Sequence, residues 1–209
     1  MSLSDIVQQF LTDIRFVRWQ EWVSTTTQIM SVYYARKNNI LVYPTGIIGV
    51  ILAAWVYFFI AEPPLYGDGI LNLYYFAMSV YGWVNWSKTN ENNTETFPVS
   101  WCNKQELLTG MLAFTLSWLA IYLLLINLTD SNTPILDSLV SSSALTAMWW
   151  MAKRKIENWL MWIFSNIVAI PLNFYKGFML FTLMYLLFLI MAMQGYYEWR
   201  GMQEKGKKV

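Results

Sequence analysis

Long runs without a charged residue constrain this chain more than any other feature of its sequence. Five runs of 18 to 24 residues contain no Asp, Glu, Lys or Arg, and about 20 helical residues cross the hydrocarbon layer of a bilayer. Two shorter runs, 22–35 and 138–152, are rich in hydroxyls, which a span tolerates where it faces the interior of a helix bundle. We therefore predict an all-α, polytopic membrane protein with seven transmembrane helices. The five long runs are 38–61, 69–87, 107–129, 158–175 and 177–197.

Composition agrees with a lipid environment and excludes several chemistries. Only 13% of the 209 residues are charged, about half the share of a soluble domain. Histidine is absent and Cys102 is the single cysteine, which excludes zinc sites, thiol redox pairs and histidine acid–base chemistry. A net charge of +1 gives no reason to expect a nucleic acid partner. We expect no cofactor and no metal.

The basic residues predict the orientation of the chain. With seven spans, 11 of the 14 Lys and Arg residues lie on the side that holds the C-terminus. The other side holds Arg15, Arg18 and Lys176. The positive-inside rule then places the C-terminus in the cytoplasm and the N-terminus outside. Residues 1–20 have helically spaced apolar side chains and predict a short amphipathic helix on the outer side.

Two segments of the chain, 31–86 and 148–199, follow the same order of elements. Each has a hydroxyl-rich helix, a basic turn, a second helix, a Tyr/Gly turn and a third helix that ends in Gly-x-x-x-Trp. The helix between them is left as a linker, so the two three-helix repeats run in parallel, as repeats do in some transporters. The predicted segments are the outer segment 1–20, the first repeat 21–87, the loop and linker helix 88–130, the second repeat 131–199 and a basic tail 200–209.

Neutral polar and aromatic side chains form candidate faces on these helices. Asn72, Tyr75, Ser79 and Trp83 follow steps of 3, 4 and 4 on the third span, and Trp162 and Asn166 lie four apart on the sixth. The first span adds Gln28, and the fifth adds Asp137 or Ser138 and Ser141 or Ser142, of which we take Asp137 and Ser142. Stacking surfaces with neutral donors and acceptors suit a planar heterocycle that carries hydroxyls.

Several of these residues have a structural alternative. Hydroxyls in spans often bond their own backbone, which applies to Ser142, and Asp137 is equally suited to a helix cap. Asp68 resembles an N-cap, and Lys153–Lys155 resembles a topology anchor. Tryptophans near span ends usually lie in an interfacial belt. We expect this position for Trp19, Trp22, Trp86, Trp101 and Trp199.

The motifs of residues 20–200 resemble those of the PnuC-type vitamin transporters. The resemblance rests on Lys155-Ile-Glu-Asn-Trp159-Leu-Met-Trp162-Ile-Phe-Ser-Asn166, Tyr175-Lys-Gly177, Gly195-x-x-x-Trp199, Leu65-Tyr66-Gly67-Asp68, Asn72-Leu-Tyr-Tyr-Phe and Tyr81-Gly-Trp83-x-x-Trp86. It implies a multi-pass protein of the bacterial inner membrane with a SWEET-like three-one-three fold, commonly a homotrimer. It also implies facilitated diffusion of nicotinamide riboside, a precursor of NAD, trapped inside by a cytoplasmic kinase. The family's riboside-binding Trp-x-x-x-Asn corresponds to Trp162 and Asn166.

Other functions remain to be distinguished. Thiamine is the alternative cargo, since it is also a cationic heteroaromatic that tryptophan can bind. A structural membrane protein without transport activity is the alternative from another class. An intramembrane aspartyl enzyme needs paired carboxylates within the membrane, whereas Asp68 and Asp137 are predicted at outer span ends. We therefore expect no enzymatic activity.

Overall fold

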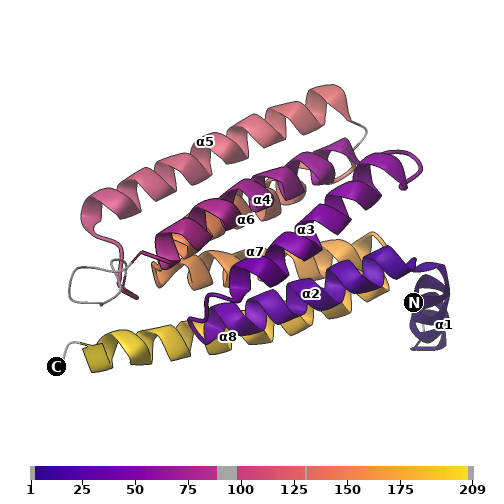
Figure 1. Ribbon diagram of the computed structural model, residues 1–209. Helices are drawn as coiled ribbons and strands as arrows, with labels where there is room; N and C mark the ends of the chain where they lie inside the picture. Colours follow the sequence, from indigo (N-terminus) through magenta and orange to yellow (C-terminus); the bar gives the residue numbers. More distant parts are fainter. Residues whose placement is uncertain (1–2, 89–97, 130, 207–209) are drawn as a thin grey trace.

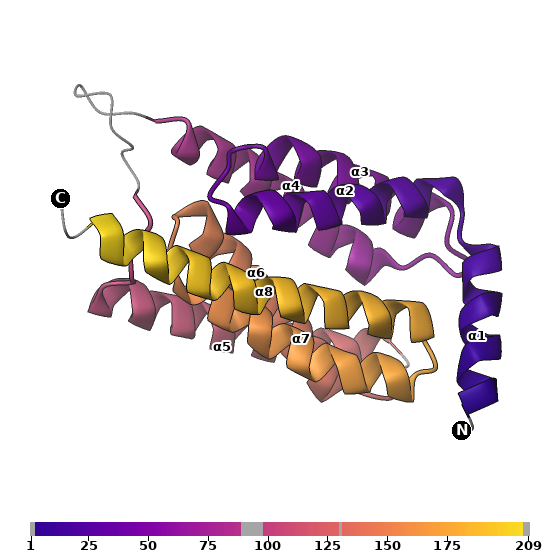
Figure 2. The same cartoon turned by 90° about the horizontal axis from the view of Figure 1, so that it is seen from below.

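The computed structural model describes residues 3–88, 98–129 and 131–206, which form eight helices. Lys207 and Lys208 of the predicted tail lie outside these ranges. The helices lie along a common bundle direction except α1, which runs across it, and the termini lie at opposite ends (Figures 1 and 2). The helices are α1 (Leu3–Phe16), α2 (Trp19–Arg36), α3 (Val42–Phe59), α4 (Tyr66–Trp86), α5 (Lys104–Leu128), α6 (Pro134–Ala152), α7 (Glu157–Tyr175) and α8 (Met179–Gly206).

The helix contacts close a ring. In the order α2, α3, α4, α6, α7 and α8, each helix packs against the next, and α8 packs against α2. The linker α5 packs against α6 outside this ring, and α1 packs against α8. The first group, α2–α4, therefore meets the second group, α6–α8, along two seams, α4–α6 and α8–α2.

The same turn joins the first two helices of each group. Asn38 and Arg154 both adopt left-handed backbone conformations, with φ of 52° and 53°. Their amides donate to Ala35 O and Met151 O, each at 2.9 Å. The two turns match in backbone conformation although their residues differ. Since Asn38 and Arg154 are 116 residues apart, the match aligns each position of α7 with the position 116 residues earlier in α3.

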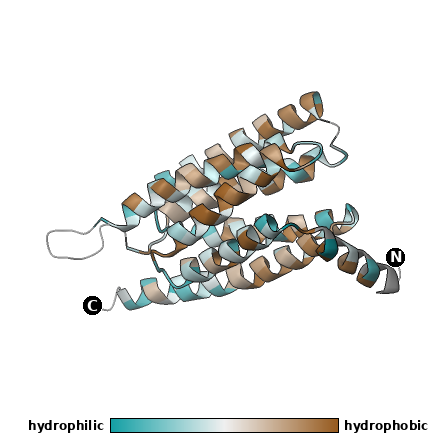
Figure 3. Cartoon of the chain, turned by 45° about the vertical axis from the view of Figure 1, so that its right-hand side comes forward, coloured by the Kyte–Doolittle hydropathy of each residue, from teal (hydrophilic) through white to brown (hydrophobic). Residues whose placement is uncertain are grey.

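Apolar surface is exposed on many helices. Three helices of the described ranges, α3, α5 and α8, are long and apolar enough to cross a membrane by length and composition. Leucines of α5 such as Leu108 and Leu112 are about 60% exposed, which water would penalise and lipid would not. Hydrophobic residues cover much of the helix surface, whereas the C-terminal end of α8 is hydrophilic (Figure 3). These surfaces agree with a protein whose solvent is largely lipid.

The buried core lies at the end of the bundle that holds the basic turns Arg36–Lys37 and Lys153–Lys155, which we call the basic end. Its composition corrects two expectations from the sequence. Trp86 and Trp199 are 4% and 0% exposed, so the belt position predicted for both is wrong. Each packs where the two groups meet, which no single-helix pattern reveals. Trp19, Trp22 and Trp101 are exposed, as a belt requires. The cluster of buried residues comprises Ala35, Val42, Tyr43, Trp86, Met151, Ile156, Trp159, Ala192 and Trp199.

Two further expectations change at helix ends. The helix α4 begins at Tyr66 with Leu65 as its N-cap, so Asp68 lies inside the first turn and is not the cap. Arg154 is 3% exposed, and its guanidinium lies 4.4 Å from the centroid of the Trp86 ring. The basic run is therefore more than an exposed topology anchor. The helix α8 continues into the basic segment 200–209 as far as Gly206, where Arg200 and Glu204 form an ion pair of 3.0 Å.

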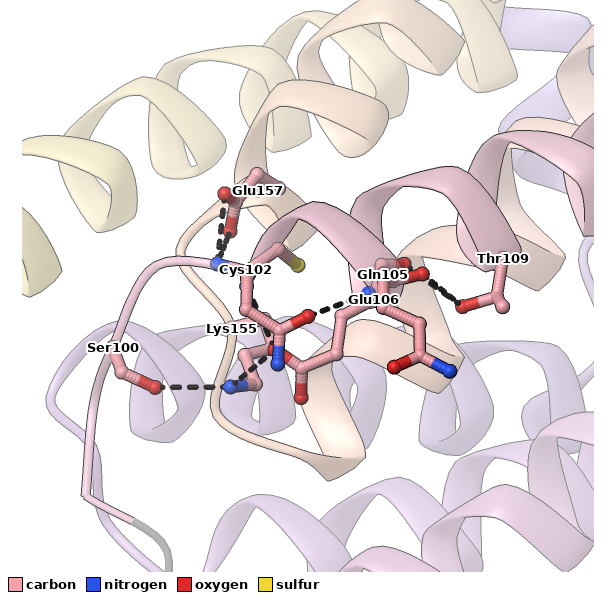
Figure 4. A network of polar contacts seen from close by, with 8 residues as sticks. Ser100, Cys102, Gln105, Glu106, Thr109, Lys155 and Glu157 are labelled. Carbon is pink, nitrogen blue, oxygen red and sulfur yellow. Dashed lines mark hydrogen bonds and ion pairs between the residues drawn. The ribbon is translucent and has the colours of Figure 1, made fainter.

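A polar network attaches the start of α5 to the turn between α6 and α7 (Figure 4). The Glu157 carboxylate accepts from the Cys102 amide at 2.9 and 3.0 Å, and Lys155 Nζ lies 2.9 Å from Glu106 Oε2 and 3.2 Å from Ser100 Oγ. Burial, followed by the nearby Glu157 carboxylate, raises the pKa of Cys102 to about 12. The thiol is therefore protonated and unreactive at neutral pH.

We predict that Gly195→Ala destabilises the protein and that Gly201→Ala does not. A Cβ at Gly195 would lie 2.6 Å from the Trp159 ring, whereas one at Gly201 would have no neighbour within 4 Å. Overpacking of this kind costs about 1–3 kcal/mol, while alanine at an exposed helical site is neutral or favourable. Thermal unfolding in detergent measures both variants, which sit on the same helix. Equal melting temperatures would contradict the close packing.

Candidate functional site

The centre of the candidate site is an aromatic pair that joins the two groups. The rings of Tyr75 on α4 and Trp162 on α7 lie 6.5 Å apart between centroids and are tilted by 51°. Trp162 packs against the buried cluster at the basic end, so it lies at the edge of that core. Its indole N–H is buried and has no partner among the described residues. A bound molecule could accept this hydrogen bond and stack on the ring.

Asn166 lies one turn from Trp162 on the same face of α7. It is 3% exposed, yet its side-chain amide forms no hydrogen bond with any residue in the part of the chain that the structure describes. Its amide atoms are not among the fully buried unpartnered atoms of the described residues, so they keep some access to solvent and are free to bond a ligand. Such a group is suited to binding a polar ligand.

The α4 residues of the predicted face divide into two sets. Asn72 and Ser79 are buried, 9% and 2% exposed, on either side of Tyr75 along the helix. Asn72 Nδ2 donates to Asp68 O of its own helix at 2.9 Å, which leaves its Oδ1 available. Trp83, one turn after Ser79, is 41% exposed. The step pattern alone does not separate these two sets, because helical spacing drifts over three turns.

Gln28 lies in the interface between α2 and α3. Its Nε2 donates to Ser24 Oγ at 2.9 Å, and Ser24 Oγ donates to Gly49 O at 2.8 Å. Gly49 allows this approach, since a Cβ there would lie 2.8 Å from Gln28 Cγ. The structure therefore places Gln28 against α3, with its hydrogen-bond partner in its own helix.

Ser142 has the contact that its structural alternative describes, whereas Asp137 does not cap α6, whose N-cap is Thr133. Ser142 is fully buried, and its hydroxyl donates to Ser138 O of the preceding turn at 2.7 Å. Asp137 accepts from Ser131 Oγ at 2.7 Å and Thr133 Oγ1 at 3.1 Å, and pairs with Lys176 at 2.6 Å. Its carboxylate therefore holds the start of α6 to the turn after α7.

Two residues that sequence reasoning did not single out flank the site. Tyr74 OH donates to Leu145 O at 2.9 Å and fixes α4 against α6. Ser165 Oγ donates to Val140 O at 3.2 Å and fixes α7 against α6. Both side chains bond to backbone carbonyls of a neighbouring helix. Since every residue has such a carbonyl, the sequence gives no sign of these partners.

The chemistry of the central residues is neutral. Tyr75, Trp162, Asn166, Asn72 and Ser79 provide ring faces, amides and hydroxyls, and carry no formal charge. No group of three or more His, Cys, Asp or Glu side chains that could hold a metal ion occurs within residues 3–88, 98–129 and 131–206. The arrangement is suited to reversible binding of a flat, polar molecule.

Known proteins resemble the chain over most of its length. The sequence pattern of the nicotinamide mononucleotide transporter family matches residues 18–201. The nicotinamide riboside transporter PnuC of Escherichia coli strain K12 shares 23% identity over 91% of this chain and 89% of its own. PnuC of Neisseria mucosa shares 28% identity over 87% of this chain and 72% of its own. The riboflavin/roseoflavin transporter RibM of Streptomyces davaonensis shares 18% identity over 92% of this chain and 89% of its own.

A solved structure agrees with these relatives. The crystal structure of the vitamin B3 transporter PnuC matches with a TM-score of 0.71 and 26% identity, over 97% of this chain and 90% of that one. Relatives and fold therefore agree on a non-enzymatic membrane transporter for a small vitamin-like molecule. The match over residues 18–201 shows that this chain belongs to the nicotinamide mononucleotide transporter family, among its PnuC-type members.

Proposed function

We propose that this protein is a uniporter for nicotinamide riboside in a bacterial inner membrane. The observation that carries the proposal is the half-buried Trp162, whose indole N–H is buried without a partner, on the same face of α7 as Asn166, whose amide bonds no described residue. The nicotinamide ring would stack on Trp162 and Tyr75, and the ribose hydroxyls would bond Asn166. Asn72 and Ser79 would complete the site, with Trp83, Gln28, Asp137 and Ser142 further along the path.

We further propose that α2–α8 are seven membrane spans in a three-one-three arrangement. The helix contacts support two parallel repeats, because the first helix of each group packs on the third helix of the other. The proposed segments keep the boundaries of the sequence prediction, 1–20, 21–87, 88–130, 131–199 and 200–209. The surplus of basic residues at the C-terminal end supports a cytoplasmic C-terminus and an outer N-terminus.

Transport in this proposal follows alternating access. The two repeats rock about the site, which opens in turn to either side of the membrane. The central residues are neutral, so no coupled ion is needed and uptake is facilitated diffusion. Phosphorylation by a cytoplasmic kinase would trap the riboside, and the protein would assemble as a homotrimer.

Replacing Trp162 or Asn166 by alanine should impair riboside uptake into liposomes. Losing the stacking ring should reduce affinity at least tenfold, which corresponds to about 1.4 kcal/mol. Losing the amide should reduce affinity about fivefold, since one hydrogen bond contributes about 1 kcal/mol. Concentration-dependent uptake of labelled riboside measures both effects.

Matched controls are available outside the site. Trp55 on α3 is 55% exposed, and Asn127 on α5 donates to Leu123 O of its own helix at 2.7 Å. Trp55→Ala and Asn127→Ala should transport normally. Unchanged uptake in both Trp162→Ala and Asn166→Ala would rule out this site.

Ligand-dependent thermal stability should identify the cargo. A ligand at 100 times its Kd stabilises the folded protein by about 2.7 kcal/mol. We expect nicotinamide riboside to raise the melting temperature of the wild-type protein and to leave Trp162→Ala unchanged. Thiamine is the alternative cargo in this panel, and riboflavin is included because RibM is a relative. A shift with thiamine alone would exclude the riboside, and no saturable uptake of any member would favour a structural role.

A further inference from the structure

The two Gly-x-x-x-Trp segments make the same contact across the two seams. Trp86 of α4 donates from Nε1 to Met151 O at the end of α6, at 3.3 Å. Trp199 of α8 donates from Nε1 to Ala35 O at the end of α2, at 2.9 Å. Each indole therefore bonds a helix of the other group, and each seam is closed by one such bond at the basic end.

The glycine of each Gly-x-x-x-Trp segment makes room for an aromatic ring of the same three-helix group, and that ring contacts the tryptophan. A Cβ at Gly82 would lie 2.4 Å from the ring of Tyr43, and one at Gly195 would lie 2.6 Å from the ring of Trp159. Tyr43 and Trp159 thereby reach Trp86 and Trp199 in edge-to-face contacts with centroid distances of 5.0 and 5.5 Å. Each tryptophan is thus fixed on its own group and bonded to the other.

The two tryptophans also meet each other. Their ring centroids lie 5.9 Å apart, and both side chains are buried. At the same end, Lys37 of α2 pairs with Glu198 of α8 at 3.2 Å. This pair is partly exposed, so it adds little to closure. Arg36 also contacts Gln194 and Glu198 across this seam, and Asn85 Nδ2 donates to Ala152 O at 3.5 Å across the other. The indole pair is the buried aromatic contact between the two groups at this end.

We propose that Trp86 and Trp199 form the cytoplasmic gate of the transporter, an inference that rests on the alternating access proposed above. To open the site to the cytoplasm, the groups must separate along both seams at this end. Both indole bonds then break and the ring pair parts. Trp162 packs against the cluster to which both tryptophans belong, so a cargo on its ring would lie next to the core that contains the gate.

The bonding of the two carbonyls suits a reversible gate. Ala35 O and Met151 O each accept a turn amide, from Asn38 and Arg154, as well as an indole N–H. When the indole leaves, the carbonyl keeps the turn amide on its other lone pair. The released indole N–H then faces cytoplasmic water. Opening therefore leaves no buried group without a partner.

The test uses a single cysteine behind the gate. Ala192 is 2% exposed and belongs to the cluster, so Ala192→Cys in a Cys102→Ser background should react with a charged thiol reagent only when the gate opens. Trp86→Phe and Trp199→Phe keep the ring and remove the donor. Each should speed labelling from the cytoplasmic face about fivefold, the equivalent of one hydrogen bond of about 1 kcal/mol.

Trp101→Phe is the matched control, because Trp101 lies near the same end and its indole is 37% exposed. Its labelling rate should equal that of the parent. Labelling that is unchanged in both gate variants, or faster only from the outer face, would overturn the proposal. Gel-filtration profiles establish that each variant is folded. Since labelling needs no cargo, loss of the gate is distinguishable from failure of the riboside assignment, which uptake measures alone.

Discussion

Lipid cannot hydrogen-bond a polar side chain, and this constraint explains most polar contacts in the protein. Ser142, Thr182 and Thr146 donate to carbonyls of the preceding turn, and Ser24 and Ser31 donate to α3. Against this background, a buried amide or indole without a partner is informative. Other buried groups among the described residues also lack a partner, including Tyr43 OH, Trp150 Nε1 and Trp159 Nε1. Trp162 differs from these in that its ring faces Tyr75 of the other group.

The two halves share a scaffold but differ in its centre. The matching turns at Asn38 and Arg154 align Tyr43 with Trp159, and both rings press on a glycine of the third helix. The same alignment places Gly46 and Val50 opposite Trp162 and Asn166. Gly46 serves helix packing against Ser31. The turn and the contact between an aromatic ring and a glycine are thus present in both halves, whereas the candidate binding pair is present in one.

The sequence predicts the helices well, because runs without charge and basic turns are local signals. It does not predict the burial of Trp86 and Trp199, since their partners come from helices more than 60 residues away. The hydroxyl and amide faces were also ambiguous. Gln28 and Asn166 both lie on polar faces of predicted spans, and only the structure shows that Gln28 packs against Gly49 of α3 and bonds Ser24. Which neighbour a helix face contacts depends on how two helices pack, and the residue pattern of one helix does not contain that information.

The single occurrence of the Trp162–Asn166 pair bears on how such proteins diverge. Because Gly46 and Val50 occupy the equivalent positions, substitutions at the candidate pair change one half of the protein without disturbing the duplicated contacts. A duplicated ancestor would have been free to specialise one copy for recognition and to keep the other as a mechanical counterpart. The duplicated parts would then retain their glycines and aromatic rings, while relatives with different vitamins would differ mainly along α7 and its neighbours.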